Sequence, residues 1–181
     1  MSGTRGMPAM VRSVVALTVI CFVAACCLVG AHALTAPIIA EQTAAAKNAA
    51  SRAVLPGSDS FTMVEGQQDV LNAHGGIDVY RADNGAGLVI TVQSKGFGGA
   101  VELLVGFDPD GTVTGVMALE HSETAGVGTK ALEEKYLAGY VGQSGDVAVD
   151  AVSGATVTSK AVRAAVQQAV AIFAEVREGT V

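Results

Sequence analysis

The sequence predicts an α+β protein in which one transmembrane helix precedes a small domain with a mainly antiparallel sheet and flanking helices. Three observations indicate this fold class: an uncharged apolar run near the N-terminus, a middle section of short β-branched segments, and a long amphipathic segment near the C-terminus. The 181 residues suffice for one domain of ordinary size behind such a helix.

The apolar run extends from Val14 to Leu34 and contains no charged side chain. About 20 such residues in a helix cross the roughly 30 Å hydrocarbon core of a bilayer. We therefore predict a short N-terminal segment over residues 1–12 and a transmembrane anchor over residues 13–34.

The charges around this run predict its orientation. Arg5 and Arg12 precede it, and the first acidic residue of the chain, Glu41, follows it. Positive charge on the N-terminal side favours a cytoplasmic N-terminus and an extracytoplasmic C-terminal domain. A cleaved signal peptide is the alternative, because Ala31-His32-Ala33 has the A-x-A form of a cleavage site. Both interpretations place the domain outside the cytoplasm, and we favour the single-pass anchor because the run is longer than a signal core.

Composition limits the chemistry of the exported part. The cysteines of the chain, Cys21, Cys26 and Cys27, all lie within the apolar run and none lies in the domain that follows. We therefore expect neither a disulfide nor a cysteine-based metal or redox centre in that domain. Electron chemistry there would need a bound cofactor. The net charge of −6 argues against a nucleic-acid partner.

Turn and helix signals divide the remainder of the chain. Thr35-Ala36-Pro37 is typical of a helix start and Pro56-Gly57 of a helix end, which predicts a helical stalk over 35–56 and a domain over 57–181. Asp108-Pro109-Asp110-Gly111 between two apolar runs predicts a hairpin. We expect strands over 61–64, 78–82, 87–93, 101–107, 112–120 and 147–149, and helices over 130–140 and 159–176.

The segment from Asp150 to Ser159 is the strongest candidate for a functional site in the sequence. A loop of small and hydroxyl residues opens there directly into the last helix, whose N-terminus presents unpaired N–H groups and the positive end of the helix dipole. Such a terminus binds phosphate, and Thr156 would place a hydroxyl beside it. The same residues are also ordinary helix caps. Neither a Walker loop nor G-x-G-x-x-G is present, so the physical pattern leaves both interpretations open.

The pattern Asp150-x-x-Ser153-Gly154-Ala155-Thr156 resembles the flavinylation motif of the FMN-binding domain family. That family includes the G subunit of Rnf-type ion-translocating electron-transport complexes and the C subunit of sodium-translocating NADH:quinone oxidoreductase. The resemblance implies that a flavin transferase esterifies the FMN phosphate to Thr156. It implies that Asp150, Ser153, Gly154 and Ala155 form the recognition signal of that transferase.

Two further stretches resemble the Rnf G subunit. Residues 96–105 are similar to its glycine-rich turn and following strand, and residues 120–128 are similar to its E-H-x-E-T-P-G-L-G loop, with Ala125 and Val127 in place of Pro and Leu. We interpret Gly96, Gly98 and Gly99 as turn residues. The resemblance implies that the second loop lies against the flavin ring through Glu123, Thr124, Gly126, Val127 and Gly128.

The resemblance implies an electron-transfer subunit of an ion-translocating ferredoxin:NAD oxidoreductase complex, with covalent FMN as its cofactor. The implied partners are the other membrane subunits, the flavin transferase and the membrane itself. We expect no metal site at His121 and no catalytic nucleophile, because no second histidine or general base is suitably spaced. Two alternatives remain: a flavin-free extracytoplasmic binding or scaffold module, and a covalent FMN carrier of a different exported electron-transfer chain.

Overall fold

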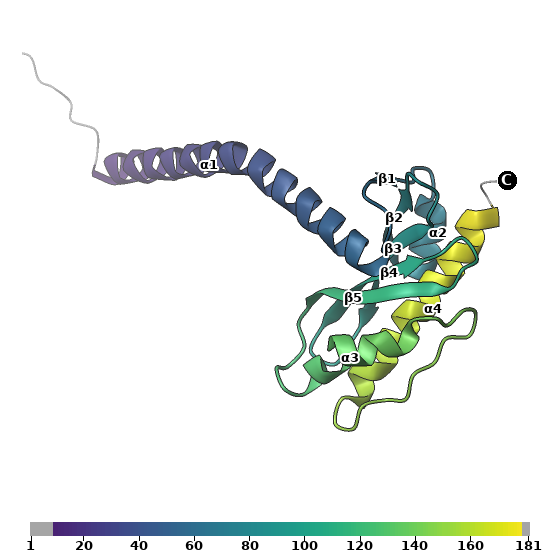
Figure 1. Ribbon diagram of the computed structural model, residues 1–181. Coiled ribbons are helices and arrows are strands. Elements are labelled where there is room, and N and C mark those ends of the chain that lie inside the picture. Colours follow the sequence, from purple (N-terminus) through teal and green to yellow (C-terminus); the bar gives the residue numbers. More distant parts are fainter. Residues whose placement is uncertain (1–8, 179–181) are drawn as a thin grey trace, which may run out of the picture. The chain divides into compact units, whose positions relative to one another are not determined.

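The computed structural model describes the backbone of residues 9–178 and the side chains of residues 14–30, 32, 35 and 45–178. The chain divides into two compact units, Met1–Ala46 and Lys47–Val181. A long helix, α1, begins in the first unit and ends in the second (Figure 1).

Helix α1 (Ala9–Val54) is continuous. It passes without interruption through residues 35–37, where we expected a new helix to begin, because helix-forming residues flank Pro37 on both sides. Within the part of the chain that the structure describes, no helix combines the length and the apolar character needed to cross a membrane. Residue 13 and residues 31, 33 and 34 of the predicted anchor lie outside the described side chains, and the anchor stays a prediction.

The second unit contains a five-stranded antiparallel sheet in which each strand pairs with the next along the chain (Figure 1). This arrangement confirms the predicted sheet and the hairpin at Asp108–Gly111. The strands are β1 (Phe61–Met63), β2 (Gly76–Ala82), β3 (Leu88–Lys95), β4 (Ala100–Phe107) and β5 (Val113–His121).

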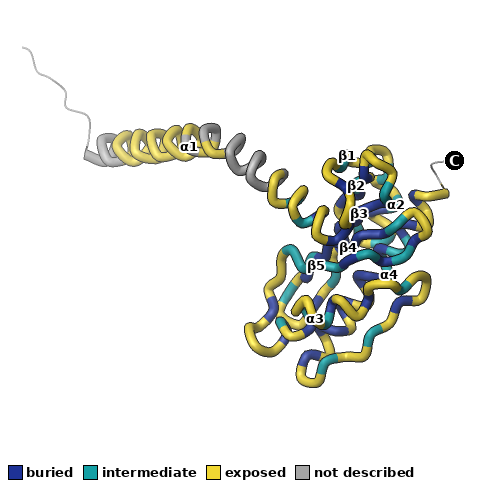
Figure 2. Tube along the Cα trace, viewed as in Figure 1, coloured by how far each residue is buried: buried dark blue, intermediate teal, exposed yellow. Residues whose placement is uncertain are grey.

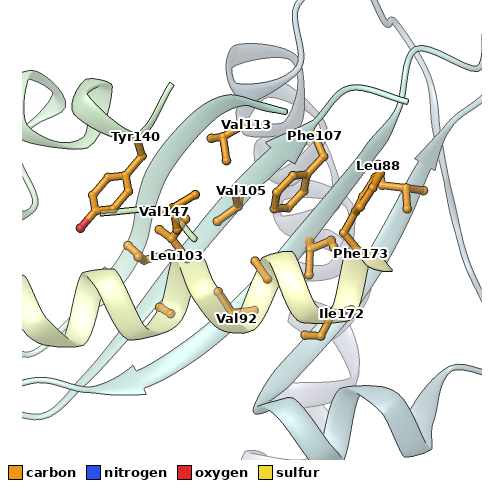
Figure 3. Close-up of a cluster of buried hydrophobic side chains, with 14 of the residues drawn as sticks. Leu88, Val92, Leu103, Val105, Phe107, Val113, Tyr140, Val147, Ile172 and Phe173 are labelled. Carbon is orange, nitrogen blue, oxygen red and sulfur yellow. The ribbon is translucent and has the colours of Figure 1, made fainter. Parts of the chain in front are cut away.

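Helix α4 (Thr156–Glu178) packs on one face of this sheet. Because side chains alternate between the faces of a strand, Ile90 and Leu103 point toward α4, whereas their neighbours Val89 and Leu104 face the end of α1. Figure 3 shows the α4 side of the core, where the rings of Phe107 and Phe173 lie 5.1 Å apart. Buried residues are concentrated along β3, β4 and α4 (Figure 2).

Several elements differ from the sequence prediction. The expected helix over 130–140 is broken into η1 (Gly128–Ala131), α3 (Glu134–Leu137) and η2 (Ala138–Tyr140). Residues 147–149, where we expected a strand, have no regular secondary structure and pair with none of the described strands. The side chain of Gln143 instead donates to the carbonyl and accepts from the N–H of Ala148.

The structure also contains a short helix that the sequence did not predict, α2 (Gln68–His74). Seven residues are too few to establish a helical period, and only Leu71 among them is buried. Gly75 ends this helix with a φ of 70°, a left-handed conformation that favours glycine. His74 Nε2 lies 2.8 Å from Oε1 of Glu175, which connects α2 to α4.

The end of α1 contacts the sheet at a cross-strand pair of glycines. Gly106 of β4 faces Gly115 of β5, and the carbonyl of Val54 accepts a hydrogen bond of 2.6 Å from the Thr114 hydroxyl beside them. A Cβ atom on Gly115 would lie 2.6 Å from Cα of Val54, and one on Gly106 would lie 2.4 Å from its carbonyl oxygen. The two glycines therefore provide the space in which Val54 is buried.

We predict that Gly115→Ala lowers the free energy of unfolding by about 1–3 kcal/mol, because the added methyl group overlaps the backbone of Val54. Urea unfolding of the purified chain measures the change. Gly139→Ala is the matched control, since the atoms nearest to its Cβ would belong to the side chain of Val149, at 3.2 Å, and not to a backbone. Equal stability of Gly115→Ala and the control would contradict this packing.

Candidate functional site

A cavity of about 250 Å³ lies at the N-terminus of α4. Three segments distant in sequence form its walls: the glycine-rich turn before β4, the loop after β5, and the first turn of α4. Its lining residues are Phe97, Glu123, Val127, Gly128, Gly154, Ala155, Thr156, Val157 and Thr158.

The chain enters α4 through a tight turn. Gly154 has a φ of 82°, which side-chain-bearing residues rarely adopt, and the N–H of Ala155 donates to the carbonyl of Val152. The carbonyl of Ala155 accepts the N–H of Ser159 at 2.8 Å, so Ala155 is the residue at the helix boundary. Helix geometry leaves the N–H groups that follow without intrahelical acceptors, and the positive end of the helix dipole lies at the same place. The helix start therefore offers a phosphate-binding environment.

The hydroxyl groups of this segment have different surroundings. Thr158 is 1% exposed and donates to Oε2 of Glu123 at 2.9 Å. Ser159 is 2% exposed and accepts the N–H of Val152 at 3.0 Å. Ser153 is exposed but does not line the cavity. Thr156 is exposed and lines the cavity, which makes its hydroxyl the accessible one at this site.

Glu123 joins the three walls of the cavity. Its side chain is almost fully buried, and its Oε1 accepts the N–H groups of Phe97 at 2.7 Å and Gly98 at 3.1 Å. Its Oε2 accepts the hydroxyl of Thr158. One carboxylate thus connects the glycine-rich turn, its own loop and α4 by accepting hydrogen bonds from three donors.

The glycines around Glu123 allow this close approach. A Cβ atom on Gly96 would lie 2.0 Å from Oε1 of Glu123, and one on Gly128 would lie 2.1 Å from Oε2. A Cβ atom on Gly98 would lie 2.3 Å from the carbonyl oxygen of Ser122. Gly96 also donates its N–H to the carbonyl of Gly99, as expected of a turn. These residues therefore shape the turn and make room for the carboxylate.

Exposed apolar side chains surround the cavity. Phe97 is 73% exposed, Val157 51% and Val127 47%. The volume is slightly below the roughly 300–1,000 Å³ of sites that enclose a whole drug-sized ligand. Apolar walls, an accessible hydroxyl and a helix N-terminus fit a partly enclosed group that has both a flat aromatic ring and a phosphate.

The structure brings many of the sequence-predicted site residues together. Those that line the cavity are Glu123, Val127, Gly128, Gly154, Ala155 and Thr156. Asp150 and Ser153 are exposed and lie outside the lining, as do Thr124 and Gly126. The last two shape the loop: Thr124 accepts the N–H of Val127, and Gly126 donates its N–H to the Thr129 hydroxyl.

Sequence reasoning missed three lining residues, Phe97, Val157 and Thr158. Phe97 is an aromatic residue inside a glycine-rich turn, and this placement could have indicated that its ring is available to a ligand. Val157 and Thr158 directly follow Thr156 in the sequence. The inward direction of Thr158 depends on where α4 begins, which was predicted three residues too late.

The fold and this cavity define a small α+β domain whose cavity has features suited to a phosphate-bearing aromatic group. The family model of the FMN-binding domain matches residues 96–171, which include all three cavity walls. The G subunit of the proton-translocating ferredoxin:NAD(+) oxidoreductase complex of Clostridium ljungdahlii is 30% identical over 165 residues, covering 85% of this chain and 86% of its own length. The G subunit of the Na(+)-translocating ferredoxin:NAD(+) oxidoreductase complex of Acetobacterium woodii is 28% identical over 183 residues, covering 87% and 88%.

Among solved structures, NqrC of Shewanella oneidensis matches with a TM-score of 0.49 and 22% sequence identity, over 71% of this chain and 74% of that one. The identity and mutual coverage of the curated relatives establish the family. The chain belongs to the FMN-binding domain family, in the group that contains the G subunits of Rnf-type ion-translocating oxidoreductase complexes.

We predict that Gly98→Ala destabilises the domain by about 1–3 kcal/mol, because the new methyl group overlaps the backbone oxygen of Ser122 and displaces the loop that carries Glu123. Urea unfolding of the purified chain measures the loss. An unchanged unfolding midpoint would show that the turn and the loop do not pack as described.

Proposed function

We propose that this chain is the electron-transfer subunit of an Rnf-type ferredoxin:NAD oxidoreductase complex, carrying FMN through a phosphoester on Thr156. The main support is the difference between neighbouring hydroxyls. Thr156 is exposed in the cavity, whereas Thr158 and Ser159 are buried and engaged in hydrogen bonds. The membership in the FMN-binding domain family gives the chemical class of the cofactor.

The first turn of α4 holds the phosphate in this proposal. Its unpaired N–H groups and the helix dipole stabilise negative charge. Gly154 and Ala155 carry little or no side chain, so the phosphate reaches the backbone closely. Asp150 and Ser153 are exposed and outside the cavity, which suits residues that the flavin transferase recognises rather than residues that hold the bound cofactor.

The attachment requires an activated flavin phosphate, because a free phosphate monoester does not esterify a hydroxyl spontaneously. The transferase would supply the flavin as a phosphoanhydride with a nucleotide. The bond formed joins Oγ1 of Thr156 to the flavin phosphorus, the bond broken is the anhydride P–O bond, and the hydroxyl proton and the nucleoside monophosphate leave.

The apolar residues at the cavity hold the ring. Phe97 and Val157 provide exposed apolar surface for one part of a flat aromatic system, and Val127 extends that surface from the loop after β5. The bound FMN supplies one- and two-electron redox chemistry. Because the cavity encloses only part of such a group, the ring keeps an open side for electron exchange with a partner subunit.

The proposed location and partners are supported by the sequence and by the names of the relatives. The uncharged run from Val14 to Leu34, with arginines before it, supports a single-pass anchor, a cytoplasmic N-terminus and an extracytoplasmic domain. The names of the relatives describe them as subunits of ion-translocating complexes. We therefore propose other membrane subunits as the electron donor and acceptor, and a flavin transferase as the maturation partner.

We predict that Thr156→Val abolishes covalent flavin because it removes the acceptor hydroxyl and keeps the side-chain shape. The full chain is coexpressed with a flavin transferase, separated by denaturing electrophoresis, imaged for flavin fluorescence and analysed by intact mass. The unaltered chain gains one FMN phosphoester, and Thr156→Ser retains part of the labelling. Thr62→Val, an exposed threonine on β1, is the control and labels fully.

A fluorescent band from Thr156→Val would show that another residue carries the flavin. An unlabelled band from the unaltered chain, with the transferase active on a second substrate protein, would favour a flavin-free binding module.

A further inference from the structure

We propose that Glu123 is a positioning residue that holds the cavity walls around the flavin and lowers its redox potential through the carboxylate charge. This inference rests on the proposed function, because it requires FMN in the cavity at the start of α4. The inference goes beyond attachment of the cofactor, because it gives this chain control over the redox potential of the flavin.

The positioning role follows from the hydrogen bonds of Glu123. The backbone of Phe97 is held at the cavity by a hydrogen bond of 2.7 Å from its N–H to Oε1 of Glu123. The first turn of α4, another part of the cavity wall, is bonded to the same carboxylate through the hydroxyl of Thr158. Glu123 therefore links Phe97 to the first turn of α4, two parts of the cavity wall that would contact the ring in the proposed function.

The effect on potential follows from charge. Glu123 is the ionisable residue among those that line the cavity. Reduction adds negative charge to a flavin ring, and a fixed carboxylate nearby opposes that charge strongly in a partly buried site. The carboxylate therefore lowers the potential. Its three hydrogen bonds offset part of its charge, so a lost donor increases the effect.

Two near-isosteric variants are expected to shift the potential in opposite directions. In Glu123→Gln, the amide oxygen still accepts the N–H groups of Phe97 and Gly98, and the amide nitrogen donates to Thr158, so the walls stay in place while the charge is lost. The potential then becomes more positive. Thr158→Val removes the donor to Oε2 and leaves the charge less compensated, so the potential becomes more negative.

The experiment is a spectroelectrochemical titration of the flavin-loaded full chain and its variants at one pH. Glu120→Gln is the matched control, since Glu120 is an exposed carboxylate at the end of β5 and outside the cavity lining. We expect the control to keep the potential of the unaltered chain. A merely structural role of Glu123 would not produce shifts of opposite sign in Glu123→Gln and Thr158→Val.

A second measurement does not need the flavin. Hydrogen exchange of the Phe97 and Gly98 amides in the unloaded chain should remain slow in Glu123→Gln and become fast in Glu123→Ala, which removes the acceptor. Protected amides in Glu123→Ala would overturn the positioning role.

Equal potentials in the unaltered chain and Glu123→Gln, or shifts of the same sign in Glu123→Gln and Thr158→Val, would overturn the effect of the charge. If the unaltered chain takes up no flavin at all, the proposed function fails instead. The two failures are therefore distinguishable.

Discussion

The carboxylate of Glu123 is the point at which three separate parts of the chain meet. It accepts hydrogen bonds from the glycine-rich turn and from α4 while its own backbone belongs to the loop after β5. A nearly buried carboxylate without such donors would be strongly destabilising. The turn, the loop and the helix must therefore fold together, and the cavity exists because they do.

This constraint also explains the residue types near the cavity. Gly96 and Gly128 lack side chains where a Cβ atom would overlap the carboxylate, and Gly98 approaches the backbone of Ser122. Thr158 donates its hydroxyl to Glu123 and is thereby buried, while Thr156, two residues earlier, points to a different side of the helix and stays accessible. The sheet and α4 form the rigid core that holds these segments in place.

The sequence predicted the elements whose signals are local. The strands, the hairpin at Asp108–Gly111 and the last helix follow from periodicity and turn chemistry. The motif around Thr156 lies at the candidate cavity. Local signals were insufficient for α2, for the broken helices over 128–140, and for the side-chain contacts of Gln143 that replace a strand. The contact between Glu123 and Thr158 joins residues 35 positions apart and depends on the register of α4, so no local pattern contains it.

The most direct test of this account is a crystal structure of the full chain purified after coexpression with a flavin transferase. The account predicts continuous electron density from Oγ1 of Thr156 to a flavin phosphate at the start of α4, with the ring against Phe97 and Val157 and Glu123 still bonded to Thr158. A structure in which Thr156 is unmodified, or in which the flavin lies away from this cavity, would contradict it.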